Sequence, residues 1–183
     1  LKKVSFGEGM EKVPWRVFLK YNQNSDPSSK VEEIEIPESV KIIGAWAFAD
    51  CDGLREITLP KSLETIEVRA FSDCDGLSGI VLPEGLKEIE GYAFQGCKGL
   101  TEVEIPGSVT SIGEFAFEGC ENFSTITLND GLENIGRNFI GGTQVTELSV
   151  PKTVTSMEYA LYGAQDLKKV SFGEGMEKVP WRV

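Results

Sequence analysis

The four cysteines are the residues best suited to chemistry, because a thiolate can act as a nucleophile or bind a metal ion. They stand 23 residues apart, and no histidine occurs among the 183 residues. The lack of histidine removes the commonest general base, the commonest metal ligand and every histidine-containing triad. Even spacing indicates a structural period, so we expect no catalytic site, metal site or cofactor. The expected core column of free thiols is Cys51, Cys74, Cys97 and Cys120.

The stretches around the first two cysteines resemble the start of a calcium loop. Asp-Cys-Asp-Gly occurs at residues 50–53 and again at 73–76. An EF-hand loop also needs a third oxygen ligand before the glycine and a glutamate six residues after it. Neither stretch supplies the full set, and we interpret both as turns that redirect the chain.

The residues around the cysteines, which must position them, repeat with the same period. A proline follows a short apolar run at positions 37, 60, 83, 106 and 151, and Asn129 takes the same place between the last two. The steps between these anchors are 23, 23, 23, 23 and 22 residues. We therefore predict a single repeat domain over 1–183. Its units begin near residues 1, 31, 54, 77, 100, 123 and 145, with a partial unit from 167.

Each unit contains the pattern of a short strand and a return path. In Ile57-Thr58-Leu59 the apolar residues share one face of a strand, and the following proline ends it. An Ala-Phe pair, as at 47–48, stands in a stretch too short for a full helix, so we expect a helical or 3₁₀ turn there. No unit can bury its apolar columns alone, and stacked units bury them against each other. The predicted fold is a solenoid with a parallel β-sheet on one side and short strands and turns on the return.

The repeated pattern resembles the BspA-like, or Treponema-type, leucine-rich repeats. Residues 103–120, VEIPGSVTSIGEFAFEGC, are similar to the consensus of that family. The departures are local: Thr143 replaces a cysteine, and Ala160-Leu161-Tyr162 replaces the Ala-Phe pattern. The resemblance implies a leucine-rich-repeat solenoid of a bacterial or protist protein on the cell surface or outside the cell. It also implies adhesion, since several members bind host matrix proteins or other cells.

Composition excludes several other functions. The net charge of −11 and the pI near 4.6 argue against nucleic-acid binding, which needs basic patches, and against adsorption to anionic membranes. No apolar run approaches the roughly 20 residues of a membrane-spanning helix, so we expect no direct membrane insertion. No signal peptide is visible in this chain.

The outward-facing places of the predicted strands carry a set of glutamates. They lie two and four residues before each anchor, and stacking places them in ladders on one face of the sheet. Glycine at 79 and threonine at 125 interrupt one ladder. One interpretation is an acidic face that binds a basic protein partner; the other is a solvated face that keeps the protein soluble. The candidate ligand-binding residues are Glu33, Glu35, Glu56, Glu102, Glu104 and Glu147.

Three further features depart from the repeat. We expect the polar insertion at 22–30 to form an exposed loop, either a binding element or a tolerated insertion. Residues 1–17 are identical to 167–183, and we expect end-to-end association or exchange of this duplicated segment between chains. Trp46 stands just before an Ala-Phe pair, and Trp15 and Trp181 are copies of each other. We expect these tryptophans to serve either packing at the repeat edge or an interface.

These features predict a non-catalytic protein-binding or adhesion module. Solenoids present extended surfaces, and the resemblance points to a host matrix protein or another surface protein as the partner. The alternative is a passive spacer or stalk without a specific ligand.

Overall fold

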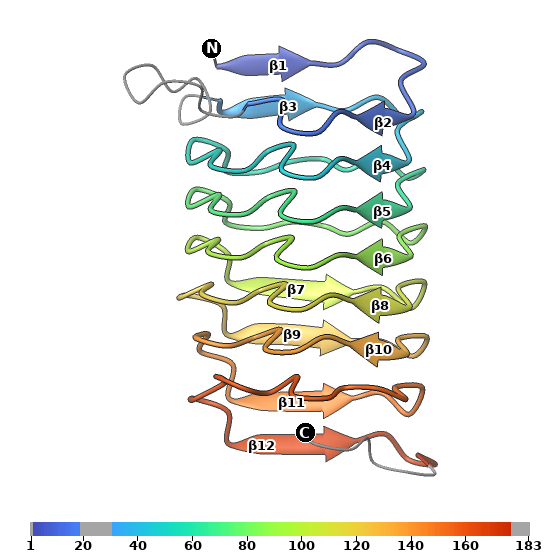
Figure 1. Ribbon diagram of the computed structural model, residues 1–183, viewed down its shortest axis with the longest axis vertical. Helices are drawn as coiled ribbons and strands as arrows, with labels where there is room; N and C mark the ends of the chain where they lie inside the picture. Colours follow the sequence, from blue (N-terminus) through green and yellow to red (C-terminus); the bar gives the residue numbers. More distant parts are fainter. Residues whose placement is uncertain (1, 19–30, 177–183) are drawn as a thin grey trace.

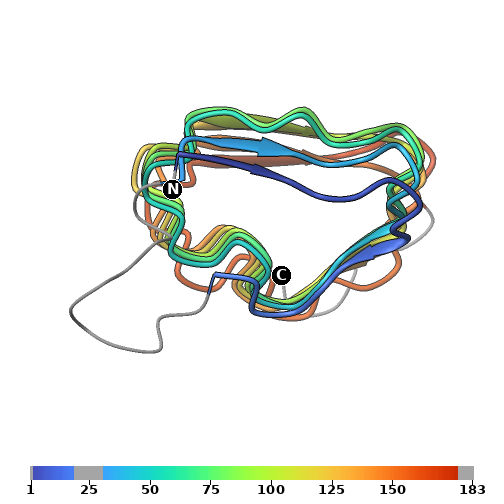
Figure 2. The same cartoon turned by 90° about the horizontal axis from the view of Figure 1, so that it is seen from above.

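The chain winds into a solenoid whose turns lie one above another (Figure 1). The structure is a computed structural model, and it describes residues 2–18 and 31–176. Viewed along the long axis, the turns share one oblong outline with strands on its two long sides (Figure 2). We call these sides the first layer, which holds the strands just before the anchors, and the return layer. The duplicated tryptophan at 181 and the insertion at 22–30 lie outside the described residues.

The return layer is a continuous parallel sheet of six strands of two residues each. Its order is β10-β8-β6-β5-β4-β2, so each turn pairs with the next in the same register. The strands are β2 (Lys12–Val13), β4 (Ile42–Ile43), β5 (Thr65–Ile66), β6 (Glu88–Ile89), β8 (Ser111–Ile112) and β10 (Asn134–Ile135). The second residue of every strand is buried, as the apolar column of the sequence predicts.

The first layer is divided into three parallel pairs, β1 with β3, β7 with β9, and β11 with β12. These strands are β1 (Lys3–Ser5), β3 (Glu33–Glu35), β7 (Glu102–Ile105), β9 (Thr125–Leu128), β11 (Glu147–Val150) and β12 (Lys169–Phe172). Residues 56–59 and 79–82 fill the same place in the two turns between β3 and β7, and their peptide groups form no hydrogen bond to a neighbouring turn in the part of the chain described. The parallel sheet expected for this fold is therefore continuous on the return side and interrupted on the first.

The expectation of a helical turn at the Ala-Phe stretch is corrected by the structure. The described residues contain hydrogen-bonded turns and no helix. In an α-helix, successive N–H groups donate to carbonyls of the same segment. Here alternate N–H groups donate to the following turn instead: Trp46 to the carbonyl of Val68 at 3.0 Å, and Phe48 to that of Ala70 at 2.8 Å. Trp46 also has a φ of 59°, in the left-handed region. A helix cannot form where half of its donors are bonded to the next turn.

The core consists of columns that run the length of the solenoid. The rings of Phe71, Phe94 and Phe117 stack nearly parallel, with centroids 5.3 Å apart. Beside them the four cysteines are buried free thiols, as expected. Three thiols donate to phenylalanine carbonyls of the preceding turn, as Cys97 Sγ does to Phe71 at 3.0 Å. Thr143 takes the next place in this column and is also buried, its hydroxyl donating to the Ile140 carbonyl at 2.7 Å.

Candidate functional site

The six glutamates of the predicted acidic face are all exposed on the outside of the first layer. The alternation of the strands places them there, because each stands next to a buried residue such as Ile34, Val103 or Leu148. The structure nevertheless does not bring all six together. They form three groups along the solenoid, which differ in what neutralises them.

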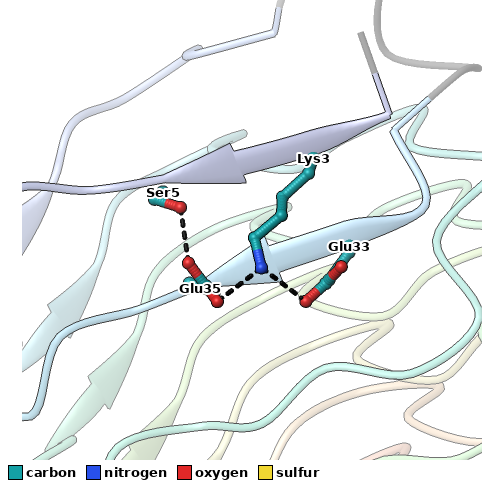
Figure 3. Close-up of polar contacts among 4 residues, drawn as sticks. All are labelled: Lys3, Ser5, Glu33 and Glu35. Atoms are coloured by element: carbon teal, nitrogen blue, oxygen red, sulfur yellow. Dashed lines mark hydrogen bonds and ion pairs between the residues drawn. The ribbon is translucent and has the colours of Figure 1, made fainter.

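The first group, at the N-terminal end, is neutralised by a lysine (Figure 3). Lys3 Nζ on β1 lies 2.9 Å from a carboxylate oxygen of Glu33 and 2.6 Å from one of Glu35, both on β3. The hydroxyl of Ser5 donates to the second oxygen of Glu35 at 2.5 Å. The hydrogen bonds from Lys3 and then Ser5 lower the pKa of Glu35, and those with Glu35 and Glu33 raise the pKa of Lys3.

The C-terminal group repeats this arrangement with one glutamate. Lys169 on β12 pairs with Glu147 on β11, with Nζ and Oε2 3.2 Å apart. Lys3 and Lys169 are equivalent positions of the duplicated segment. The acidic face is therefore neutralised at both ends by the same lysine of the same sequence.

The central group keeps its negative charge. Within residues 2–18 and 31–176, the side chains of Glu56 and Glu102 have neither an ion pair nor a hydrogen bond. Glu104 accepts a hydrogen bond from the amide of Asn129 at 3.0 Å, which leaves its charge uncompensated. In the described chain, these are the glutamates of the predicted face that no lysine or arginine side chain pairs with.

A shallow hollow of about 380 Å³ lies beside Glu102 and Glu104, which stand two turns beyond the turn that carries Glu56. Its lining comes from three successive turns and includes Val81 and Glu84 from the first, Glu102 and Glu104 from the second and Thr127 from the third. Val81 is 84% exposed, an unusually high fraction for a valine. The hollow lies where the strand ladder of the first layer is interrupted, next to Gly79, whose missing side chain leaves open space.

Sequence reasoning did not find this hollow or Val81. Two signals were present: Gly79 interrupts the glutamate ladder, and Val81 is an apolar residue at an outward-facing place. Glycine and valine can each be explained within a single strand, so nothing in the sequence pattern connects them.

A second hollow, of about 400 Å³, lies on the return side. It is lined by Val68, Glu90, Tyr92 and Glu114 among others. Tyr92 belongs to an outward row of stacked rings and guanidinium groups: Arg69 lies 4.2 Å from its centroid, and the ring of Phe115 lies 4.8 Å away. Both faces of Tyr92 are therefore occupied within the row, which reduces what this hollow can offer a ligand.

Trp46 belongs to the same row. The guanidinium groups of Arg16 and Arg69 lie 5.5 Å and 4.9 Å from its centroid, and the side chain is half-buried. This geometry favours the packing interpretation of Trp46. Trp15, at the N-terminal end of the row, is 57% exposed and carries Arg16 at 4.5 Å.

The cysteines and the described aspartates beside them lie in settings that favour structural roles. Burial, first, and hydrogen bonds with the neighbouring cysteines raise the pKa of Cys97 well above its ordinary value, which disfavours the thiolate. Asp73, in the second Asp-Cys-Asp-Gly stretch, has a φ of 58° and accepts from the Ser72 hydroxyl at 2.8 Å, as a turn residue does. Asp75 pairs with Lys98 at 3.0 Å. Among the described residues, no group of three or more cysteine and acidic side chains could hold a metal ion.

Comparisons with known proteins agree with this repeat architecture. The sequence matches the model of the "BspA type Leucine rich repeat region (6 copies)" over residues 25–106 and 87–183. A search of curated proteins gives no match. The described part of the chain contains no helix that is long and apolar enough to cross a membrane.

Two solved structures show the same fold with comparable sequences. A leucine-rich repeat protein from Bacteroides ovatus is 30% identical over 88% of this chain, with a TM-score of 0.73. This chain spans 45% of that protein's length. The T. pallidum Leucine Rich Repeat protein (TpLRR) is 27% identical, with a TM-score of 0.63; the match covers 76% of this chain and 75% of that one. With its 23-residue turns and the family match over most of its length, the chain belongs to the BspA-type leucine-rich repeat family.

Proposed function

We propose that this chain is a non-catalytic protein-binding module of a bacterial surface or secreted leucine-rich repeat protein. It binds a basic protein segment through the centre of its first layer. The observation that carries the proposal is the combination of unpaired Glu56 and Glu102 with exposed Val81 beside the 380 Å³ hollow. Family membership supports the setting, since leucine-rich repeats present extended surfaces to partners.

The chemistry of this region suits a partner that carries both charge and apolar surface. Carboxylates that form no ion pair attract a lysine or arginine of the partner over about one Debye length, roughly 8–10 Å at physiological salt. Val81 offers an apolar contact that needs no desolvation of a charge, and burying a valine side chain contributes about 1.5–3 kcal/mol. Charge then guides encounter and selectivity, while apolar contact contributes to affinity.

The experiment compares binding to purified extracellular-matrix proteins by surface plasmon resonance at low and high salt. The test variant is Glu56→Lys with Glu102→Lys. Its matched control is Glu121→Lys with Glu133→Lys, which makes the same change in net charge at exposed glutamates outside this face. We expect the test variant to lose binding by at least about tenfold and the control to keep it within about twofold, because rim charges act locally. In a third variant, Val81→Ser should weaken binding without changing its salt dependence.

Two outcomes contradict the proposal. Equal loss in test and control variants would mean that only net charge matters and that the face is not a site. No binding to any matrix protein at any ionic strength would favour the spacer function, since a spacer retains nothing.

A further inference from the structure

The same sequence pairs in two opposite ways within one chain. Residues 2–10 and 168–176 both read KKVSFGEGM. In the first copy, β1 pairs with the turn that follows it, with Lys3 opposite Glu33. In the second copy, β12 pairs with the turn that precedes it, with Lys169 opposite Glu147. One segment is thus compatible with a neighbouring turn on each of its two sides.

Within the described residues, each copy leaves free the side that the other copy uses. The side of β12 facing away from β11 is identical in sequence to the side of β1 that binds β3. On β1 that side forms the ion pairs of Lys3 and one between Lys2 and Glu32 at 2.9 Å. It also packs the ring of Phe6 edge-on against Phe48, with centroids 6.2 Å apart. The equivalent residues at the C-terminal end, Val170, Phe172 and Met176, are partly buried to the same class as Val4, Phe6 and Met10.

Charge decides how two copies of the chain can join. Simple stacking of β12 of one copy on β1 of another would place Lys169 beside Lys3 in the same ladder, and like charges opposite each other are destabilising. The same segment placed against β3 would instead bring Lys169 to Glu33 and Glu35. We propose that copies of this chain assemble by segment exchange, in which residues 168–176 of one copy replace residues 2–10 of the next against β3.

The exchanged assembly is a continuous solenoid with a repeat of 166 residues, the offset between the two copies of the segment (168 − 2 = 166). The interactions that β3 makes with the displaced segment are restored by an identical one. Val170 and Phe172 become covered as Val4 and Phe6 of the displaced segment lose the same contacts, so the net gain is the conformational freedom of the released residues 2–10. The loss of translational and rotational freedom opposes assembly, so it should depend steeply on concentration.

The decisive variant is Lys169→Glu in the full chain. Exchange predicts weaker association, because the introduced carboxylate would then face Glu33 and Glu35. Simple stacking predicts stronger association, because the same carboxylate would then face Lys3. The matched control is Lys98→Glu, which removes the exposed Lys98–Asp75 ion pair in the middle of the solenoid. Sedimentation velocity from about 10 µM to about 1 mM measures the association constant, and circular dichroism verifies folding.

We expect Lys169→Glu to lower the association constant by about threefold to tenfold and Lys98→Glu to leave it unchanged. Lys3→Glu should raise it by a similar factor, because the resident segment then competes less well for β3. An increase with Lys169→Glu, or a wild-type chain that is monomeric throughout the range, overturns the proposal.

A second measurement needs no variant. Brief trypsin treatment followed by intact-mass analysis should show faster loss of N-terminal residues at high protein concentration, because exchange releases residues 2–10. Protection of these residues at high concentration would indicate simple stacking and would overturn exchange. Neither measurement involves Glu56 or Glu102, so its outcome is independent of the proposed binding function.

Discussion

Adding one methyl group to Gly113 should destabilise the fold, whereas adding it to Gly79 should not. A Cβ at position 113 would overlap the amide nitrogen of Gly91 and lie 2.5 Å from the carbonyl carbon of Glu90. Both are backbone atoms of the preceding turn and cannot rotate away as a side chain can. The turns are also held together here by the bond from Gly113 N–H to the Ile89 carbonyl, 2.7 Å long. Separating the turns to admit the methyl group would strain that bond.

The expected magnitudes have opposite signs at the two sites. Replacing glycine with alanine stabilises a protein by about 0.4–1 kcal/mol where the native backbone accepts it, because the unfolded chain loses freedom. Overpacking costs about 1–3 kcal/mol. Gly113→Ala should therefore lower the free energy of unfolding by about 1–2 kcal/mol. A Cβ added at Gly79 would have no atom within 4 Å, and the backbone there has no positive φ, so Gly79→Ala should raise the free energy of unfolding by about 0.5 kcal/mol.

The assay is urea and thermal unfolding of both variants, with circular dichroism as the signal that monitors unfolding. For a chain of this length about 1 kcal/mol shifts Tm by about 2–4 °C, so the two variants should differ by roughly 4–8 °C. Equal Tm values, or a lower Tm for Gly79→Ala than for Gly113→Ala, would refute the close backbone approach between neighbouring turns.

Two further predictions concern titratable groups. Because burial raises the pKa of Cys97, the native protein should not react with a thiol reagent at about pH 8, near the ordinary thiol pKa. All four cysteines should react once the protein is unfolded in urea. Fast reaction of the native protein would contradict the buried column of cysteines. The pKa of Glu35 is lowered in the folded state. Its pairing with Lys3 therefore stabilises the folded protein at pH values above the pKa of Glu35 in the unfolded chain, and this stabilisation is lost as the pH falls through the pKa of Glu35 in the folded protein. A carboxyl titration by NMR should place the Glu35 pKa below its usual 4.5, and Lys3→Ala should return it toward that value; an unchanged pKa in that variant would exclude Lys3 as the cause.

The core of this protein could be predicted from the sequence because a stacked repeat converts a sequence period directly into a spatial column. Ile43, Phe48 and Cys51 stand at fixed offsets from their anchor, and each is fully buried. The same reasoning placed the glutamates outside, since strand alternation follows from a period of two. No long-range pairing had to be guessed, because every turn pairs with its neighbours in sequence.

Where bonds between turns compete with local preference, the sequence was a poorer guide. The Ala-Phe stretch has the composition of a helical turn, yet Phe48 donates its N–H to the next turn. The ion pairs at the ends of the acidic face could have been found by reading the glutamate column outward to Lys3 and Lys169. The hollow beside Val81 could not, because it depends on the interruption of the first-layer ladder, which apolar and polar patterns do not encode.

One column of charges connects the two proposals. Reading along the first layer, lysines occupy the end positions and glutamates occupy most of the positions between them. If glutamates stood at the ends as well, the face would repel its own copies both in stacking and in exchange. With lysine at both ends, simple stacking is opposed and only the exchange that brings Lys169 to Glu33 remains favourable. Glu56 and Glu102 are untouched by that exchange, so each copy added to an assembly would add one more unpaired acidic site. A partner with several basic segments would then bind several copies at once, and the effective concentration of the second contact would raise its apparent affinity well above that of one site.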